Sequence, residues 1–216
     1  MAGDVKRRRP YRSPRRQEQA EQTRRRILTA ATACFIERGF ADTTIATVAE
    51  RADVAQETVY NAYGNKPTLL AEAVRNAARG SAQQPILSQR GPAASLAATD
   101  QLEQLRLFAA DIEPRLHRVG PLMAVLEAAA GGHPQLAELH RDLNAARLRN
   151  LRRFVDALAG NGPLRLANGP AADTVWALAS PQLHLLLTVT RGWSRRAYRE
   201  WLADSLAVTL LAGDHR

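Results

Sequence analysis

The apolar and polar residues between positions 43 and 70 are arranged as two short helices joined by a tight turn, followed by a third helix. Apolar residues recur at i, i+3, i+4 and i+7, which is the spacing of one buried helical face. That face consists of Ile45, Val48, Ala49 and Ala52, and it continues beyond the turn with Val54, Val59 and Tyr63. Residues 56–62 are left with a mostly polar outer face. A short helix that is braced by another helix and turns such a face outward fits the major groove of DNA.

The same block resembles the N-terminal domain of the tetracycline-repressor-like (TetR) family of bacterial transcription regulators. The positions that match the family pattern are Gly39, Phe40, Thr43, Thr44, Ile45, Val48, Ala49, Ala52, Val54, Thr58, Val59, Tyr60, Asn65, Lys66, Leu69 and Leu70. The resemblance covers about residues 23–74 without interruption. An ordinary helical packing module could show the same periodicity, but the spacing of Tyr60 and Lys66 and the basic residues before the block favour a DNA-binding domain.

The chain departs from the family pattern at four positions. Asp53 stands where the family usually has Gly, so it either adopts the left-handed backbone conformation, which Asp tolerates, or caps the next helix together with Gln56. Ala55 replaces a common Ser or Thr and removes a hydroxyl cap. Ala62 stands where His or Tyr often binds a phosphate. Tyr63 replaces Phe, and its hydroxyl needs a partner or solvent.

Seven residues are candidates for contacts with DNA. The resemblance implies that phosphates are held by Thr43, Thr44, Tyr60 and Lys66, whose side chains suit that role. Gln56 and Thr58 come early in the second helix and are expected to reach base edges, where Gln suits adenine. Asn61 is a candidate for a base or a phosphate. Glu57 could accept a hydrogen bond from cytosine or could favour the positive end of its own helix, and we prefer the second interpretation.

The first 26 residues carry ten basic and three acidic side chains, which is a net charge of +7 out of +9 for the whole chain. Pro10 and Pro14 and the scarcity of apolar residues predict that the first part of this arm is disordered in isolation. Next to a helix-turn-helix, a flexible basic arm could follow phosphates or enter a minor groove. The alternative is a solvated tail that only improves solubility.

The rest of the chain predicts further helices and almost no strands, so the expected fold is all-α. It has an N-terminal helix-turn-helix domain and a larger C-terminal helical domain for ligand binding and dimerisation. The expected divisions are a disordered basic arm at 1–18, the helix-turn-helix domain at 19–64, and a linker helix with the regulatory domain at 65–216. The expected helices cover 19–38, 44–63 with its turn, 65–79, 95–111, 114–130, 134–159, 171–190 and 194–212. Residues 80–94, rich in Ser, Gln, Pro and Gly, are expected to form a loop.

The final two helices also resemble the C-terminal end of many TetR-like regulators. The resemblance implies that they pair with their copies in a second subunit to form a four-helix interface. Leu178, Leu183, Leu185, Leu186, Leu187 and Val189 cover more than one helical face, which is compatible with burial by a partner or with a fully internal helix. A two-fold homodimer would present two recognition helices to a palindromic operator on double-stranded DNA.

The resemblance further implies that the second domain binds a small-molecule effector, which the sequence allows but does not identify. The candidate lining residues are Phe108, Met123, Trp176 and His184, although ordinary core packing could explain each of them. The helix at 65–79 is the expected lever between the two domains. Ligand-independent or architectural DNA binding is the alternative function.

Other classes of protein find little support in the sequence. No phosphate-binding loop, zinc-protease motif or catalytic triad is recognisable, so we expect neither an enzyme, nor catalytic residues, nor a cofactor. His133 and His140 could share a helix face, but no cysteine or carboxylate completes a metal site, and none is predicted. No signal peptide or membrane span is expected, and no membrane partner. The single cysteine, Cys34, rules out an internal disulfide, fits a reducing cytoplasm and is expected in the core.

Overall fold

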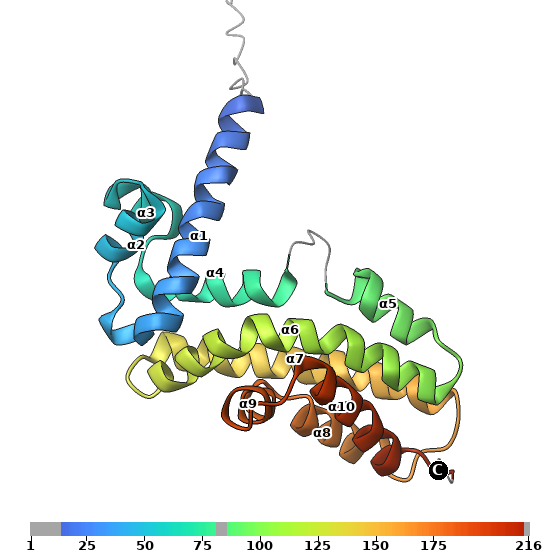
Figure 1. Ribbon diagram of the computed structural model, residues 1–216. Helices are drawn as coiled ribbons and strands as arrows, with labels where there is room; N and C mark the ends of the chain where they lie inside the picture. The colour runs from blue at the N-terminus through green and yellow to red at the C-terminus, as the bar shows by residue number, and fades with distance from the viewer. Residues whose placement is uncertain (1–13, 81–85, 214–216) are drawn as a thin grey trace, which may run out of the picture.

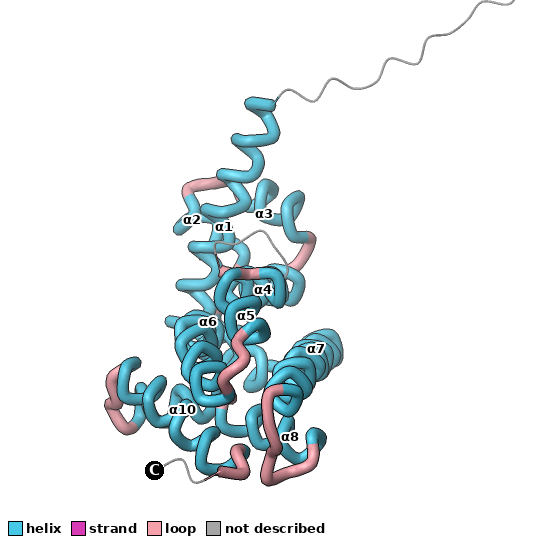
Figure 2. The backbone as a smooth tube through the Cα atoms, turned by 90° about the vertical axis from the view of Figure 1, so that its right-hand side faces the viewer, coloured by secondary structure: helices cyan, strands magenta, loops and turns pink. Residues whose placement is uncertain are grey.

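The computed structural model describes residues 14–80 and 86–213, apart from the side chains of Pro14 and Arg16. The all-α prediction is confirmed: the described chain consists of helices joined by short loops (Figures 1 and 2), with one isolated antiparallel bridge between Leu164 and Leu211. The predicted disordered arm lies largely outside the described residues. Where the description begins, α1 starts at Pro14, earlier than the predicted Gln19.

The N-terminal part contains α1 (Pro14–Asp42), α2 (Ile45–Ala52), α3 (Gln56–Tyr63) and α4 (Lys66–Arg79). The regular part of α1 ends at Gly39, whose φ of 74° is easily adopted only without a side chain. The predicted buried face of α2 is confirmed, since Ile45, Val48, Ala49 and Ala52 are all buried. Cys34 is also buried, as expected for a core residue.

The turn between α2 and α3 settles the two interpretations of Asp53. Asp53 ends α2 with φ 52° and ψ 56°, which is the left-handed conformation. The N-cap residue of α3 is Ala55 rather than Asp53, and the Ala55 side chain offers no capping hydrogen bond. Arg26 of α1 closes the turn by donating to the carbonyl oxygens of Ala52 at 2.5 Å and Asp53 at 2.7 Å. The turn therefore depends on backbone geometry and on one guanidinium from another helix.

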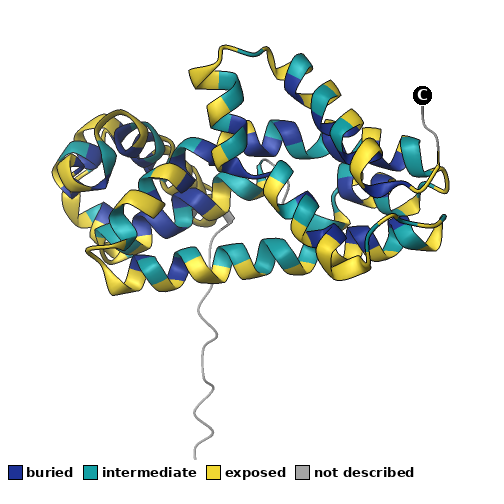
Figure 3. Cartoon of the chain, turned by 90° about the horizontal axis from the view of Figure 1, so that it is seen from below, coloured by how far each residue is buried: buried dark blue, intermediate teal, exposed yellow. Residues whose placement is uncertain are grey.

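The larger C-terminal part is built around α6 (Gln101–Ala130), which runs alongside α7 (Pro134–Gly160) (Figure 1). The other elements are a 3₁₀ turn (Ile86–Ser88), α5 (Arg90–Ala97), α8 (Asn168–Leu178), α9 (Pro181–Leu185), a π-helical turn (Leu186–Thr190) and α10 (Arg195–Leu210). α6 packs against α1, α4, α5, α7, α9 and α10. Its buried residues face neighbours on several sides, while much of the outer surface of the bundle is exposed (Figure 3).

Two apolar clusters form the core. The first joins α1–α4 to one end of the bundle, because Leu69, Leu70 and Val74 of α4 are buried together with Leu122 and Leu126 of α6. The second fills the other end between α6, α7, α8 and α10. The first cluster means that the helix-turn-helix is packed directly onto the C-terminal part rather than tethered to it.

Several predicted helix boundaries are wrong, and the predicted helix at 95–111 is divided between α5 and α6. The sequence predicted a break at Glu113–Pro114, but α6 continues through both Pro114 and Pro121. Each proline removes one backbone donor and costs about 3 kcal/mol in an isolated helix. Contacts with six neighbouring helices hold α6 together despite that cost.

The predicted helix at 171–190 is also wrong, because the structure divides it into α8, α9 and the π-helical turn. Ser180 caps α9 by accepting a hydrogen bond from the Leu183 amide at 3.1 Å, and Pro181 occupies the first turn. Proline is well tolerated at that position but disfavours a helical conformation in the residue before it. Likewise, the predicted loop at 80–94 contains the 3₁₀ turn and the start of α5.

The geometry at Asp53 leads to a paired stability test. We expect Asp53→Ala to lower the free energy of unfolding by about 1–2 kcal/mol, because alanine adopts the left-handed conformation poorly. We expect Asp53→Gly to remain close to the parent protein, since glycine adopts it freely. Both variants remove the same carboxylate, so they differ only in backbone preference. Thermal unfolding measures the difference, and equal melting temperatures for the two variants would contradict this account of the turn.

Candidate nucleic-acid interface and ligand cavity

The outer face of α3 carries the residues that the sequence predicted to meet base edges. Gln56, Glu57, Tyr60 and Asn61 are exposed, whereas Val59 on the opposite face is fully buried. Thr58 is half-buried. α2 and α4 pack against α3, so its polar face is carried by a braced helix. Glu57 lies in the first turn, where a carboxylate interacts favourably with the helix dipole.

The two threonines before α2 lie in different environments. Thr44 is exposed and caps α2, since its Oγ1 accepts a hydrogen bond from the Thr47 amide at 3.1 Å. An exposed, capped helix N-terminus is well suited to a phosphate. Thr43 is fully buried, and its hydroxyl donates to the carbonyl oxygen of Gly39 at 2.7 Å. The structure therefore does not support the predicted phosphate contact for the Thr43 hydroxyl, which instead fixes the end of α1.

Lys66 begins α4 and binds back to the end of α1. Its Nζ donates to the carbonyl oxygens of Phe40 at 2.7 Å and Ala41 at 3.2 Å, and it lies 4.4 Å from the centre of the Phe40 ring. An ammonium group has three donors, so one remains for a phosphate. Tyr60 is exposed, so its side chain is not held against α1 in the way that Lys66 is.

α1 adds polar residues beside α3 that the sequence analysis did not single out as contacts. A depression between the two helices is lined by Gln19, Ala20, Thr23, Arg24, Thr58, Asn61 and Ala62. Arg24 is exposed there, while its backbone carbonyl accepts a hydrogen bond from the Tyr63 hydroxyl at 3.0 Å. Tyr63 thus finds the partner that its hydroxyl requires, and burial raises its pKa. In the sequence, the three arginines at 24–26 were the feature from which a DNA contact by α1 could have been predicted.

A cavity of about 200 Å³ lies between α4, α5, α6 and α7. Its lining is mostly apolar and includes Val74, Ala78, Ile86, Leu87, Leu96, Phe108, Ile112, Leu116, Val119, Met123, Leu143, Ala146, Leu151 and Phe154. The rings of Phe108 and Phe154 stack with their centres 4.3 Å apart. Since Val74 and Ala78 belong to α4, an occupant would touch the helix that supports α3.

Two arginines contribute polar groups to the cavity wall. Arg115 pairs with Asp111 at 3.2 Å and donates to the Ala78 carbonyl oxygen of α4 at 2.8 Å. Arg147 donates to the carbonyl oxygens of Trp176 and Ala179, and burial lowers its pKa to about 10. The Arg147 guanidinium remains charged near neutral pH, so the cavity combines an apolar body with a few polar and charged groups.

Two of the four predicted ligand-binding residues line this cavity, namely Phe108 and Met123. Trp176 lies outside it, and its ring packs against the Arg147 guanidinium at 4.9 Å. His184 also lies outside it and is buried beside Glu113 and Tyr198. Trp176 and His184 therefore do not line this cavity, and helical periodicity could not have shown this, because it does not tell which side of a buried residue faces open space.

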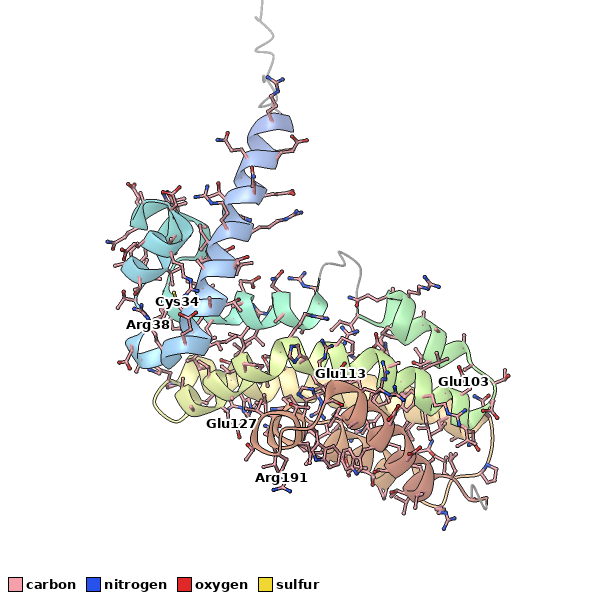
Figure 4. The ribbon with its side chains drawn as sticks, in the orientation of Figure 1. Cys34, Arg38, Glu103, Glu113, Glu127 and Arg191 are labelled. Carbon is pink, nitrogen blue, oxygen red and sulfur yellow. The ribbon has the colours of Figure 1, made fainter. Side chains whose placement is uncertain are left out.

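Glu113 and His184 form a polar group on another face of α6. Arg195 of α10 binds the Glu113 carboxylate through Nε at 2.5 Å and Nη2 at 2.9 Å. Burial raises the pKa of Glu113, but the hydrogen bond and charge of Arg195 outweigh this effect and leave the pKa below its usual value. Burial lowers the pKa of His184, so its imidazole is neutral. Figure 4 labels Glu113 in the middle part of α6.

Comparison with known proteins places the N-terminal helices in a family. Residues 27–73 match the model of the bacterial regulatory proteins of the tetR family. A protein of Mycobacterium tuberculosis described as an uncharacterized HTH-type transcriptional regulator is 32% identical over 142 residues, which are 62% of this chain and 62% of that protein. The match therefore spans less than two thirds of the relative's length.

Solved structures show the same fold over most of the chain. A regulator from Saccharomonospora viridis, solved in complex with choline, has a TM-score of 0.69 at 20% identity and covers 89% of this chain and 100% of its own. NalD, the secondary repressor of the MexAB-OprM multidrug efflux pump in Pseudomonas aeruginosa, has a TM-score of 0.67 at 21% identity, with coverage of 91% and 100%. Residues 27–73 are therefore similar to the helix-turn-helix domain of the tetR family of bacterial regulatory proteins, and the chain as a whole has the fold of these solved regulators.

Proposed function

We propose that the protein is a sequence-specific transcription regulator that binds a palindromic operator as a homodimer and is released by a small, largely apolar molecule. The observation that carries this proposal is the exposed polar face of α3, which packs against α2 and α4. Gln56, Thr58 and Asn61 read bases or adjacent phosphates. Thr44, Tyr60 and Lys66 hold the DNA backbone, with Arg24 of α1 beside them. No catalytic step is part of this function, and repression is the default outcome.

The dimer contact uses the last helical segments of the chain. Leu186 is 50% exposed, Val189 is 73% exposed and Val208 of α10 is 69% exposed, although each is a large apolar residue. Burial of these side chains against a second copy would remove apolar surface from water. Two copies would present two α3 helices to two half-sites, and coupling them would multiply the affinity of one.

Effector release acts through α4. The cavity touches α4 through Val74 and Ala78, and α4 shares its buried face with α1 and α6. A ligand that enlarges the cavity displaces α4 and changes the spacing of the two α3 helices. To lower operator affinity about a hundredfold, the ligand must prefer the released state by about 2.7 kcal/mol. The choline complex of the Saccharomonospora viridis regulator supports ligand binding in this fold.

Selection of bound duplexes from a random pool tests the function directly. A specific dimeric regulator enriches an inverted repeat, whereas an architectural DNA-binding protein shows similar affinity for any duplex. In the described part of the chain, no helix has the length and apolar character of a membrane span. A pool without enrichment at moderate salt would overturn sequence-specific recognition.

Gln56 is expected to affect which sequence is preferred. We expect Gln56→Ala to relax the preference at one base pair in each half-site, because a lost bidentate contact is worth about 1–3 kcal/mol of discrimination. Repeating the selection with the variant measures this change. Gln135→Ala is the matched control, since Gln135 is exposed on α7 far from α3 along the chain. An unchanged preference in Gln56→Ala would remove Gln56 from the base-reading set.

Lys66 is expected to affect binding to all sequences. We expect Lys66→Ala to reduce the slope of log affinity against log salt by about one for each bound subunit, because one phosphate contact is lost. The variant also removes the donor to the Phe40 and Ala41 carbonyl oxygens, so its unfolding is measured separately. Arg149→Ala removes one exposed positive charge from α7 and is the control. A folded Lys66→Ala variant with the parent's slope would contradict the phosphate contact.

The cavity can be tested before its ligand is known. We expect Ala146→Leu to weaken binding of the aromatic anionic dye 1-anilinonaphthalene-8-sulfonate at least tenfold, because the larger side chain fills the space that Ala146 lines. Ala145→Leu makes the same change at the neighbouring exposed position. Fluorescence titration measures both affinities. Equal affinity in the two variants would show that the dye binds elsewhere.

A further inference from the structure

Glu113, His117 and His184 come together at one place on the surface of α6, far from the predicted DNA contacts along the chain. Glu113 and His117 are one helical turn apart on α6, so their side chains share a face. His184 reaches them from the last turn of α9. One potential ligand atom from each residue lies within 4.8 Å of the other two. Two imidazoles and a carboxylate are a donor set that divalent transition metals prefer.

The ring of His184 is the observation that points to a ligand. His184 is 1% exposed, and neither ring nitrogen has a hydrogen-bond partner. Its Nε2 lies 3.7 Å from Glu113 Oε1, which is too far for a hydrogen bond. Buried polar atoms in native proteins are nearly always paired, and an unpaired one costs about 1–3 kcal/mol. A bound cation would give one of these nitrogens a partner.

We propose that Glu113, His117 and His184 bind one divalent transition-metal ion of the zinc type, with a fourth position open to solvent or to an external ligand. The assignment rests on three donors from two helices and on the unpartnered buried imidazole. It does not depend on DNA binding, so failure of the regulator proposal would leave it standing.

The three donors must approach one another slightly to hold the ion. At zinc–ligand distances of about 2.0–2.2 Å, tetrahedral ligand atoms lie roughly 3.4 Å apart. His117 is exposed and can make most of this adjustment. Glu113 and His184 are held by packing, because Glu113 is 3% exposed and the His184 ring meets the Tyr198 ring at 4.7 Å.

Arg195 binds the Glu113 carboxylate and would support it as a metal ligand without binding the ion itself. It binds both Glu113 oxygens, and ligating carboxylates are usually hydrogen-bonded by a neighbour in this way. Each carboxylate oxygen accepts more than one bond, so Oε1 can bind the metal while Oε2 keeps Arg195 Nη2. The guanidinium repels the cation, and its side chain is half exposed, which allows it to move away from the ion. The expected affinity is therefore moderate.

Calorimetric titration of the full, tag-free chain with zinc chloride, after chelator treatment, tests the proposal. We expect one saturable site per chain and at least tenfold weaker binding in His117→Ala. This variant changes an exposed side chain, so loss of folding is not expected to confuse the result. His133→Ala removes another exposed histidine and should leave the affinity unchanged.

Cobalt(II) provides a second readout, because its visible absorption reports nitrogen and oxygen ligands in a tetrahedral site. The band should appear with the parent protein and with His133→Ala, and should be lost in His117→Ala. Absence of saturable zinc binding would overturn the proposal. So would equal affinity of the parent and His117→Ala, or loss of binding in His133→Ala, which would place the ion near His133 and His140 instead.

Discussion

The packing of α1 and α4 against one end of α6 is the interaction on which the rest of the molecule depends. α3 has only eight residues and one fully buried side chain, and an isolated helix of that length is not stable in water. Its position is set by α2 and by the shared apolar cluster that Leu69, Leu70, Leu122 and Leu126 help to form. Fully burying each of these leucines contributes about 1.5–3 kcal/mol. The outer face of α3 can therefore remain polar, because its own packing is not required to hold it in place.

Features set by local sequence could be predicted, and features set by distant contacts could not. The buried face of α2 follows from its periodicity, and the left-handed turn at Asp53 follows from the few residue types that tolerate it. The continuity of α6 through Pro114 does not, because the helices that compensate for the missing donors are far away in sequence. Thr43 matches the family pattern, yet the pattern does not show that its hydroxyl is turned into the core. Glu113 and His184 are neighbours in space although they are 71 positions apart in sequence, and no local feature of the sequence predicted this.

The cavity and the Glu113–His117–His184 group occupy different faces of the same stretch of α6. Asp111, Arg115 and Val119 line the cavity, whereas Glu113 and His117 turn toward α9 and α10. A ligand in the cavity and an ion at the Glu113–His117–His184 group would therefore contact side chains of the same segment of α6. α6 contains Pro114 and Pro121 near this segment. Each proline lacks a backbone N–H, so fewer helical hydrogen bonds hold the helix straight there.

That segment is also attached to α4. Arg115 donates to the carbonyl oxygen of Ala78 at 2.8 Å, and Arg118 donates to that of Ala77 at 3.3 Å, so two cations from α6 close the C-terminal end of α4. At its other end α4 holds α1 through Lys66. In the proposed function, a displacement of α6 near residue 115 would be passed along α4 to the support of α3 through these hydrogen bonds. A ligand that bound both arrangements equally well would produce no such displacement, however tightly it bound. Regulation through this route therefore depends on how differently the cavity fits its occupant in the two arrangements.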